Sequence, residues 1–232
     1  MKNFSWDFKP ALKDYLYLLE NNYPQKVILK LVGDRYKLSG IERSVLYRGV
    51  TTKKDAEKRK SKLTDSINEI PELHIDTFNQ ILTIGSYLNG NVVFISRDGF
   101  LRDASEIHGK AFGDKLLNRS IELIFSFLSE KQLKNILFYI DRQVGAHQKV
   151  GELITNYSNK YKAGSEVFIS ETVDKDISKI NNGVIATSDS EIIDRSTVSV
   201  FDLARNVLSY HFNPEFVRLS EAVFVRLSEV ET

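Results

Sequence analysis

Aspartates recur directly after the apolar runs of this chain. The best placed is Asp76, which follows the run 73–75, and Asp98, Asp141 and Asp189 follow similar runs later. Carboxylates that are brought together repel one another, and their charged forms then need a cation. Mg²⁺ and Mn²⁺ prefer oxygen ligands, and such an ion polarises a phosphoryl oxygen and activates an attacking water. The pattern therefore predicts a Mg²⁺ or Mn²⁺ site formed by these four aspartates, with phosphodiester hydrolysis as its chemistry.

Each of these aspartates also has a purely structural interpretation. An aspartate after a strand is a favoured helix N-cap, and Asp141 and Asp189 fit that role. Asp98 precedes Gly99, and Asp-Gly is a turn dipeptide. Asp76 is the hardest to explain in this way, because an acid at the end of a buried central strand is costly without a partner. The metal hypothesis therefore depends most on Asp76.

The elements that must position these residues alternate along the chain. Six apolar runs are typical of strands: residues 73–76, 92–95, 136–140, 167–169, 183–187 and 198–201. Segments with helical periodicity separate most of them, including 106–130 and 147–161. This alternation implies an α/β fold with a mainly parallel sheet sandwiched by helices. Ligands of such sheets bind outside the carboxyl ends of the strands, where we expect the aspartates to gather.

The first 50 residues predict a small all-helical domain. Its third helix begins with a capping box formed by Ser39 and Glu42. Three short helices with a tight turn before the third resemble a helix-turn-helix. The domain order expected is therefore 1–50 helical, 51–70 linker, and 71–232 α/β with a C-terminal extension.

The linker is basic, and the extension contains a short repeat. The basic residues expected to meet a polyanion such as RNA are Lys53, Lys54, Lys58, Arg59 and Lys60. A charge run is usually a solvated face, and that remains the alternative. In the extension, the hexapeptide of residues 216–221 recurs at 224–229, which predicts a helix or a hairpin.

Length and composition limit the class of protein. The chain has 232 residues, a net charge of +1 and no cysteine, so zinc thiolates and cysteine catalysis are excluded. With so little net charge, any surface that attracts nucleic acid must be local. No apolar run approaches the ~20 residues of a membrane span, and no signal peptide is recognisable, so we expect a cytoplasmic protein without a membrane partner. The phosphate motifs GxGxxG and GxxxxGK[ST] are absent, which argues against a nucleotide-binding Rossmann domain or a P-loop enzyme.

Two sets of residues resemble known families. The first resembles the domain-of-unknown-function family 434 and comprises residues 23–24, 31–39 and 46–50. The second resembles family 5616, the usual C-terminal partner of family 434, and comprises residues 76–79, 97–103, 108–109 and 187–190. Neither family name supplies an activity.

A more distant resemblance does imply an activity. An aspartate and an asparagine after the first strand, with a later Thr-Ser-Asp, are similar to the PIN-like and NYN nucleases. That resemblance implies a PIN-like or Rossmann-like fold, Mg²⁺ or Mn²⁺ as the cofactor, RNA as the substrate and Asp76 and Asp189 as metal ligands. Asn79 would assist by hydrogen bonding, and Asp98 and Asp141 would complete the site or orient water. The leading hypothesis is a metal-dependent ribonuclease. The alternatives are a non-catalytic nucleic-acid-binding or scaffold protein and a small-molecule phosphohydrolase.

Overall fold

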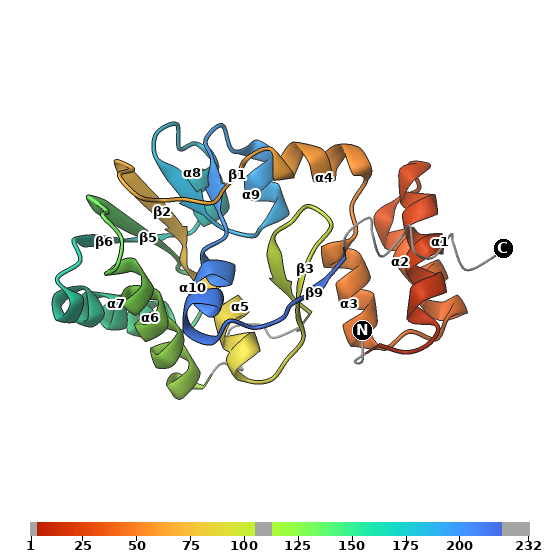
Figure 1. Cartoon of the computed structure of the whole chain (residues 1–232), viewed down its shortest axis with the longest axis horizontal. Coiled ribbons are helices and arrows are strands. Elements are labelled where there is room, and N and C mark those ends of the chain that lie inside the picture. Colours follow the sequence, from red (N-terminus) through yellow and green to blue (C-terminus); the bar gives the residue numbers. More distant parts are fainter. Residues whose placement is uncertain (1–3, 105–112, 220–232) are drawn as a thin grey trace. The chain divides into compact units, whose positions relative to one another are not determined.

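The computed structural model describes residues 4–104 and 113–219, which form two compact units (Figure 1). The first unit takes its described residues from Met1–Lys60, Asn91–Glu106 and Glu215–Thr232, and the second takes them from Ser61–Gly90 and Ile107–Pro214. The units therefore differ from the continuous segments expected, because two later stretches join the N-terminal helices.

Four helices and a small sheet make up the first unit. The helices are α1 (Phe8–Glu20), α2 (Gln25–Arg35), α3 (Gly40–Gly49) and α4 (Lys53–Lys60), and the strands are β3 (Val93–Ile95), β4 (Leu101–Asp103) and β9 (Val217–Arg218). The predicted capping box is confirmed at α3: the Glu42 N–H donates to Ser39 Oγ at 3.3 Å, and the Ser39 N–H donates to Glu42 Oε2 at 2.9 Å. The N-terminal helical region was thus predictable from local sequence.

The prediction that residues 92–95 continue the parallel sheet is wrong. β3 pairs antiparallel with β4 and parallel with β9, which gives the order β4-β3-β9. Phe94 of β3 and Leu219 after β9 are fully buried in the core of the first unit. Both approach Gly49 of α3 so closely that a Cβ there would meet atoms of each at 2.5 Å. Because of this long-range packing, the hairpin of β3 and β4 belongs to the helical unit.

The expected basic linker contains a helix, α4, rather than an irregular connection. Lys54, Lys58 and Lys60 are exposed on it. Arg59 is less accessible to a polyanion, because its side chain is only 13% exposed and pairs with Asp98 at 3.3 Å. Four of the five predicted polyanion-binding residues, Lys53, Lys54, Lys58 and Lys60, are therefore exposed on one short helix.

The second unit is an α/β domain whose six strands are all parallel to their neighbours. The strand order is β1-β8-β7-β2-β5-β6. The strands are β1 (Leu63–Thr64), β2 (Glu72–Asp76), β5 (Asn135–Asp141), β6 (Ser165–Ser170), β7 (Val184–Ala186) and β8 (Val200–Phe201). The helices are α5 (Thr77–Leu88), α6 (Asp114–Leu128), α7 (His147–Tyr161), α8 (Val173–Ser178), α9 (Ser190–Arg195) and α10 (Leu203–Phe212). The predicted parallel sheet flanked by helices is confirmed.

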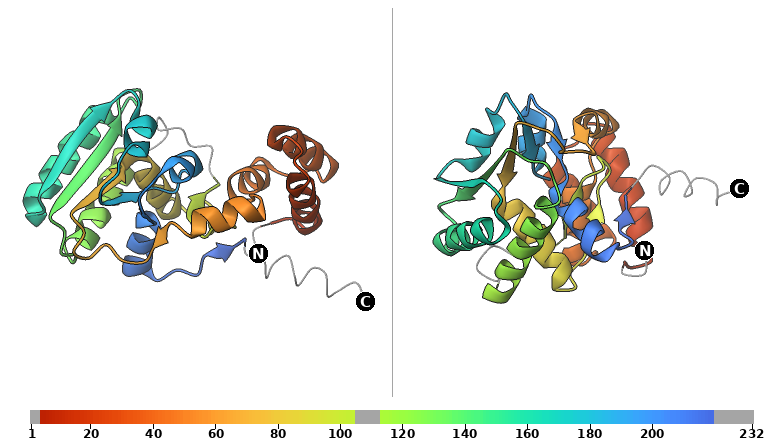
Figure 2. Two further views of the ribbon diagram at one scale, coloured as in Figure 1. Left: turned by 90° about the horizontal axis from the view of Figure 1, so that it is seen from above. Right: turned by 60° about the vertical axis from the view of Figure 1, so that its left-hand side comes forward.

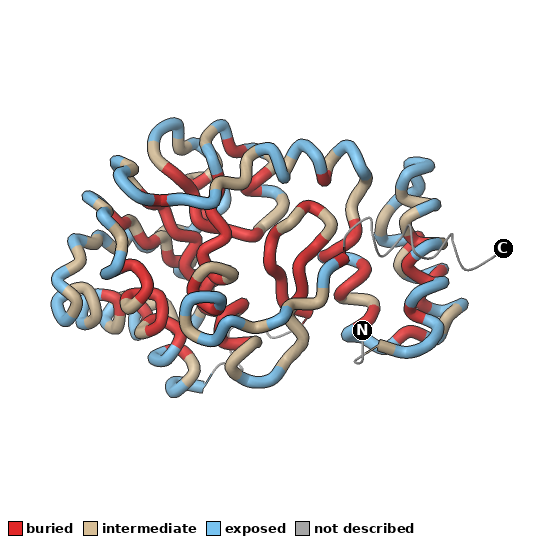
Figure 3. The backbone as a smooth tube through the Cα atoms, viewed as in Figure 1, coloured by how far each residue is buried: buried red, intermediate tan, exposed pale blue. Residues whose placement is uncertain are grey.

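Helices cover both faces of this sheet (Figure 2). On one face Phe138 of β5 stacks on Phe125 of α6 at 5.4 Å, and α5 and α7 also pack on the strands there. On the opposite face the shorter α8 packs on β2 and β5, and α9 packs on α8. The central strands β2 and β7 are buried along most or all of their length (Figure 3). Any polar side chain at their ends is therefore held by a rigid interior.

The sheet reverses its direction of growth at β2. The chain places β5 and then β6 on one side of β2, and it returns to place β7 on the other side. In open α/β sheets, such a switch point leaves a crevice outside the carboxyl ends of the strands, and ligands bind there. Asp76 ends β2 and Thr187 follows β7, so these two residues flank the switch point.

Two expected elements extend beyond the described residues. The helix expected from residue 106 is described from Asp114, after the extended N-cap Gly113, and residues 105–112 lie outside the described residues. The first copy of the repeated hexapeptide provides β9, and the second copy, 224–229, also lies outside them. Among the helices of the two described ranges, none has the length and apolarity that crossing a bilayer requires.

Candidate functional site

Asp76 lies at the end of the central strand with its side chain turned into the protein. The residue is only 8% exposed, and its Oδ2 accepts a hydrogen bond from Thr187 Oγ1 at 2.8 Å. Asp76 occupies the position before α5, and its side chain makes no close capping hydrogen bond with that helix, although the backbone N–H of Asn79 in the first turn is near enough to lower its pKa. Helix capping therefore accounts for little of the position of Asp76.

The pKa of Asp76 reflects this position. Burial raises the pKa of the carboxyl to about 7, the Thr187 hydroxyl opposes the rise, and the carboxylates of Asp189 and Asp174 add to it. In the described ranges, no lysine or arginine contributes to its environment as an ion-pair partner. Near neutral pH the group is therefore divided between its neutral and charged forms.

Asp189 and Asp141 each use one oxygen in local structure. Asp189 Oδ1 caps α9 by accepting the N–H of Glu191 at 2.7 Å and that of Ile192 at 3.3 Å. Asp141 Oδ1 accepts the Gln143 N–H at 2.8 Å in a turn after β5. The cap role that the sequence suggested for Asp189 is thus confirmed, and Asp141 has a turn role instead. Neither role uses the second oxygen of the carboxylate.

Asp174 belongs to the same group of carboxylates, although it was not among the predicted site residues. It lies in the first turn of α8, and burial and the charges of Asp189, Glu191 and Asp141 raise its pKa, whereas Arg195 lowers it. The available signal was its position shortly after the predicted strand 167–169. The structure thus links Asp76, Asp174, Asp189 and Asp141 electrostatically at the carboxyl edge of the sheet.

Asn79 is fixed in orientation beside these acids. Its Oδ1 accepts from the Ser188 N–H at 2.9 Å, from Ser188 Oγ at 3.0 Å and from Gln80 Nε2 at 2.7 Å. Three donors define which end of the amide is oxygen. The amide NH₂ of Asn79 is therefore the end that remains to donate to a ligand, in line with the predicted hydrogen-bonding role.

Asp98 is placed differently from the other predicted ligands. It belongs to the first unit, is fully buried, and accepts two hydrogen bonds from Arg102 at 2.9 and 2.8 Å. Burial alone would raise its pKa, but Arg102, Ser96 and Arg59 outweigh burial and lower it. Gly99 follows with φ +93°, which confirms the Asp-Gly turn. The prediction that Asp98 lies at the edge of the parallel sheet is wrong, because its strand belongs to the other sheet.

The donor set at the carboxyl edge suits a hard cation in its chemistry. It offers carboxylate oxygens from Asp76, Asp174 and Asp189, and hard divalent ions prefer such ligands. The spacing is more open than that of a closed metal site: among the described residues, no three acidic or histidine side chains form a group that could hold a metal ion. These acids would have to draw together around a cation to bind it.

Comparison with known proteins places the chain among families without an assigned activity. Residues 66–206 match the model described as "Domain of unknown function (DUF5616)", and residues 7–62 match "Protein of unknown function (DUF434)". The chain is 32% identical over 209 residues to "Uncharacterized protein MJ0935" of Methanocaldococcus jannaschii. The aligned region covers 86% of this chain and 96% of that protein. No solved structure matches the chain. The resemblance to families 434 and 5616 is confirmed, and the PIN-like resemblance stays a prediction.

Proposed function

Because the chain belongs to the DUF5616 family, whose description names no activity, we propose a function from the site: a metal-dependent phosphodiester hydrolase that acts on RNA. The observation that carries the proposal is the Asp76 carboxyl, which is buried at the switch point of the sheet beside other acids and without a cationic partner among the described residues. Such a group is costly to keep charged in the empty protein. A function that supplies a cation explains why it is there.

Each residue of the carboxyl edge has a distinct role in this proposal. Asp76 is the principal ligand, and the Thr187 hydroxyl holds its carboxylate in place. Asp189 and Asp174 contribute further oxygens, since their charges already reach Asp76. Asn79 presents its amide NH₂ to a phosphate oxygen. A bound Mg²⁺ or Mn²⁺ would supply Lewis-acid polarisation of the phosphoryl group and an activated water.

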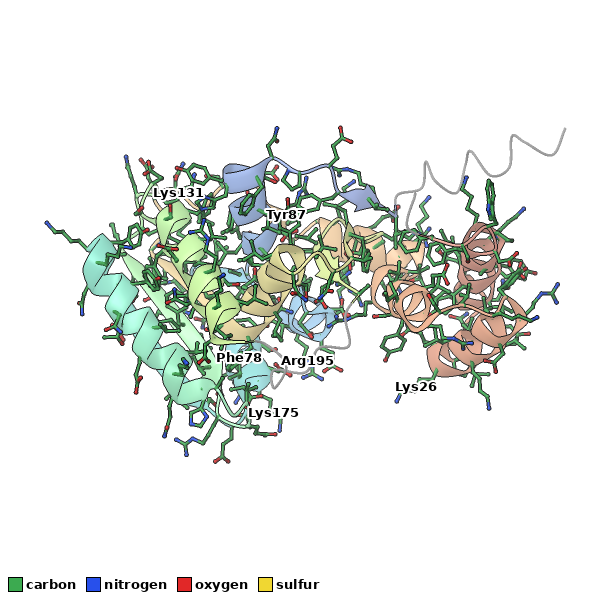
Figure 4. All side chains as sticks on the ribbon, turned by 90° about the horizontal axis from the view of Figure 1, so that it is seen from below. Lys26, Phe78, Tyr87, Lys131, Lys175 and Arg195 are labelled. Carbon is green, nitrogen blue, oxygen red and sulfur yellow. The ribbon has the colours of Figure 1, made fainter. Side chains whose placement is uncertain are left out.

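Positive charge beside the acids supports an anionic substrate. Lys175 of α8 and Arg195 of α9, both labelled in Figure 4, come from the two helices that follow β6 and β7. Arg195 is close enough to Asp174 to lower its pKa. The lysines of α4 add an exposed basic segment in the first unit, which suits a polyanion more than a small substrate.

The test compares two strand-end aspartates. A labelled RNA is incubated with the parent, Asp76→Asn and Asp202→Asn, in Mn²⁺, Mg²⁺ or EDTA, and Mn²⁺ binding is measured separately by calorimetry. Asp202 is the matched control, because its carboxylate caps α10 through the Arg205 N–H and an asparagine can still cap. We expect metal-dependent cleavage by the parent and Asp202→Asn, and its loss in Asp76→Asn.

The non-catalytic alternative predicts a different outcome. It is favoured by one observation, namely that Asp189 and Asp141 already have structural roles. If the parent neither binds Mn²⁺ nor cleaves RNA, these acids are caps and turn residues only, and the hydrolase proposal fails. If the parent cleaves a phosphorylated small molecule but no RNA, the chemistry is kept and the substrate class is replaced.

A further inference from the structure

The row of the sheet that contains Asp76 ends in two aromatic rings. Asp76 of β2 is in register with Tyr139 of β5, and Tyr139 is in register with Phe168 of β6. Residues in register on neighbouring parallel strands point to the same face of a sheet. Thr187 directly follows Ala186 of β7, which is in register with Ile75, and its hydroxyl donates to Asp76 from the other side. One face therefore carries a hydroxyl, a carboxylate and two rings side by side.

The two rings stack on each other, and the outer one faces solvent. The centroids of Tyr139 and Phe168 are 5.4 Å apart with an interplanar angle of 20°. Tyr139 packs against the small cluster formed by α8, α9 and β7, whereas Phe168 is 40% exposed. β6 is the edge strand, and α8 packs on β2 and β5, so the Phe168 ring lies beyond the part of the face that α8 covers.

The surroundings of Phe168 are too polar and too small for a typical protein interface. On the same face of β6 its neighbours are Glu166 and Ser170, which lie two positions to either side. A stable protein interface buries ~800 Å² on each partner, far more than one exposed ring provides. A single flat ring beside a polar strand suits a planar ligand instead.

We propose that Tyr139 and Phe168 form a stacking platform for one base of a single-stranded nucleic acid whose phosphate lies at Asp76. This inference rests on the proposed function and adds the strandedness of its substrate. Neighbouring strands lie ~4.8 Å apart, so Phe168 is on the order of 10 Å from Asp76 along the row. Adjacent nucleotides of an extended strand can span that separation.

The platform predicts a preference for single strands with little sequence dependence. Every base has a π-face, so stacking on an aromatic side chain tolerates all four bases. In a duplex, by contrast, the bases are already stacked on one another and cannot reach the ring. Removing a base-stacking ring from other single-strand-binding proteins weakens binding by roughly 5- to 150-fold.

The experiment measures binding without cleavage. The full chain is titrated at low salt, with Ca²⁺ in place of Mn²⁺ so that a hard cation can hold the phosphate at the carboxylates, into a short fluorescein-labelled oligouridylate and, separately, into the same probe annealed to its complement. Phe168→Ala should weaken single-strand binding roughly 5- to 150-fold, and Phe168→Tyr should restore it. The matched control is Ile169→Ala, because Ile169 is 41% exposed and, as the next residue of the same strand, points to the opposite face of the sheet.

Several other outcomes overturn the platform. If Phe168→Ala and Ile169→Ala bind the single strand equally well, or if the parent prefers the duplex, no base stacks on Phe168. If the parent binds neither probe, the platform does not serve nucleic acid. If Phe168→Ala changes the sedimentation of the protein instead, the ring belongs to a contact between copies of the chain. A protein that binds single strands but never cleaves them would remove the proposed activity and leave the platform in place.

Discussion

The Thr187 hydroxyl donates to Asp76 Oδ2 at 2.8 Å and accepts the Asp189 N–H at 3.0 Å. This one hydroxyl connects the carboxylate at the end of β2 with the loop after β7. Its hydrogen bond favours the charged form of Asp76, whereas burial and the nearby carboxylates favour the neutral form. The competition between these effects makes the pH dependence of stability the most direct readout of the site.

Asp76 should make the metal-free protein less stable as the pH rises from about 4 to 7. Its pKa is raised from 3.8 to about 7, so between these values the folded protein keeps a proton that the unfolded chain has lost. The stabilisation is fully present below the unfolded pKa and is lost as the pH rises through the folded one, at a cost of ~4 kcal/mol. In EDTA, the melting temperature of the parent should fall between about pH 4 and 7 more than that of Asp76→Asn.

At the alkaline end of this range Asp76→Asn should melt several degrees above the parent. This measurement needs no substrate and therefore tests the ligand role independently of any assay for cleavage. If Asp76→Asn melts below the parent in EDTA at every pH, the carboxylate stabilises the empty protein, and its assignment as a metal ligand loses its physical basis.

Replacing Thr187 should distinguish the contribution of its hydroxyl to stability from that of its side-chain volume. Thr187→Val removes a donor to Asp76 and the acceptor of the Asp189 N–H, and an unsatisfied buried group costs ~1–3 kcal/mol. Thr187→Ser keeps the hydroxyl and serves as the control. In urea unfolding, we expect the valine variant to be the less stable, with the midpoint of its pH dependence moved upward. Equal stability of the two variants would show that the hydroxyl contributes nothing.

The exposed lysines of α4 should contribute to RNA binding through charge. Changing Lys54, Lys58 and Lys60 to glutamate should weaken binding of a single-stranded RNA and reduce the slope of log Kd against log salt. Arg59 is left in place because it pairs with the buried Asp98.

A matched control changes the same number of charges on other helices. Lys9, Lys26 and Lys30 are exposed on α1 and α2, and their replacement by glutamate changes the net charge of the protein equally. If both triple variants lose the same affinity and the same salt slope, the effect is one of overall charge. The α4 segment would then be only a solvated surface.

Asp98 should behave as a structural residue. Its two hydrogen bonds with Arg102 are fully buried, and removing one partner of a buried pair costs ~3–5 kcal/mol. Its pKa is lowered, so the stabilisation is present above the unfolded pKa and is lost as the pH falls through the folded one. Asp98→Asn should therefore unfold at lower urea and bind Mn²⁺ as the parent does. Weakened Mn²⁺ binding with unchanged stability would instead return Asp98 to the metal ligands.

Most of the fold could be predicted from local sequence patterns. The helical segment expected at 147–161 is α7, and the strand expected to end at Asp76 is β2, because periodicity and burial agree over their whole lengths. The partner of β3 was not predictable in this way. An apolar run has the same sequence pattern whether it joins a parallel sheet or a hairpin. Here the contact of Phe94 with Gly49 places the run in the hairpin of the first unit.

The site was predictable to a similar extent. Asp76 and Asp189 follow central strands, so the sheet itself brings them together. Asp98 follows an equally convincing run, but its partner Arg59 is 39 residues away and no spacing rule reveals it. Phe168 looked like an ordinary strand residue, because only the register of three strands places it in the row of Asp76.

The three-part construction of the first unit has a consequence for synthesis on the ribosome. Its core needs Phe94 from the hairpin and Leu219 from beyond β9, although its helices are complete by Lys60. The apolar core that the nascent N-terminal helices share is therefore completed only after the whole of the second unit has been translated. The boundary between the two family matches, at residues 62 and 66, marks a change in sequence but is not a point where translation could stop and leave a finished module.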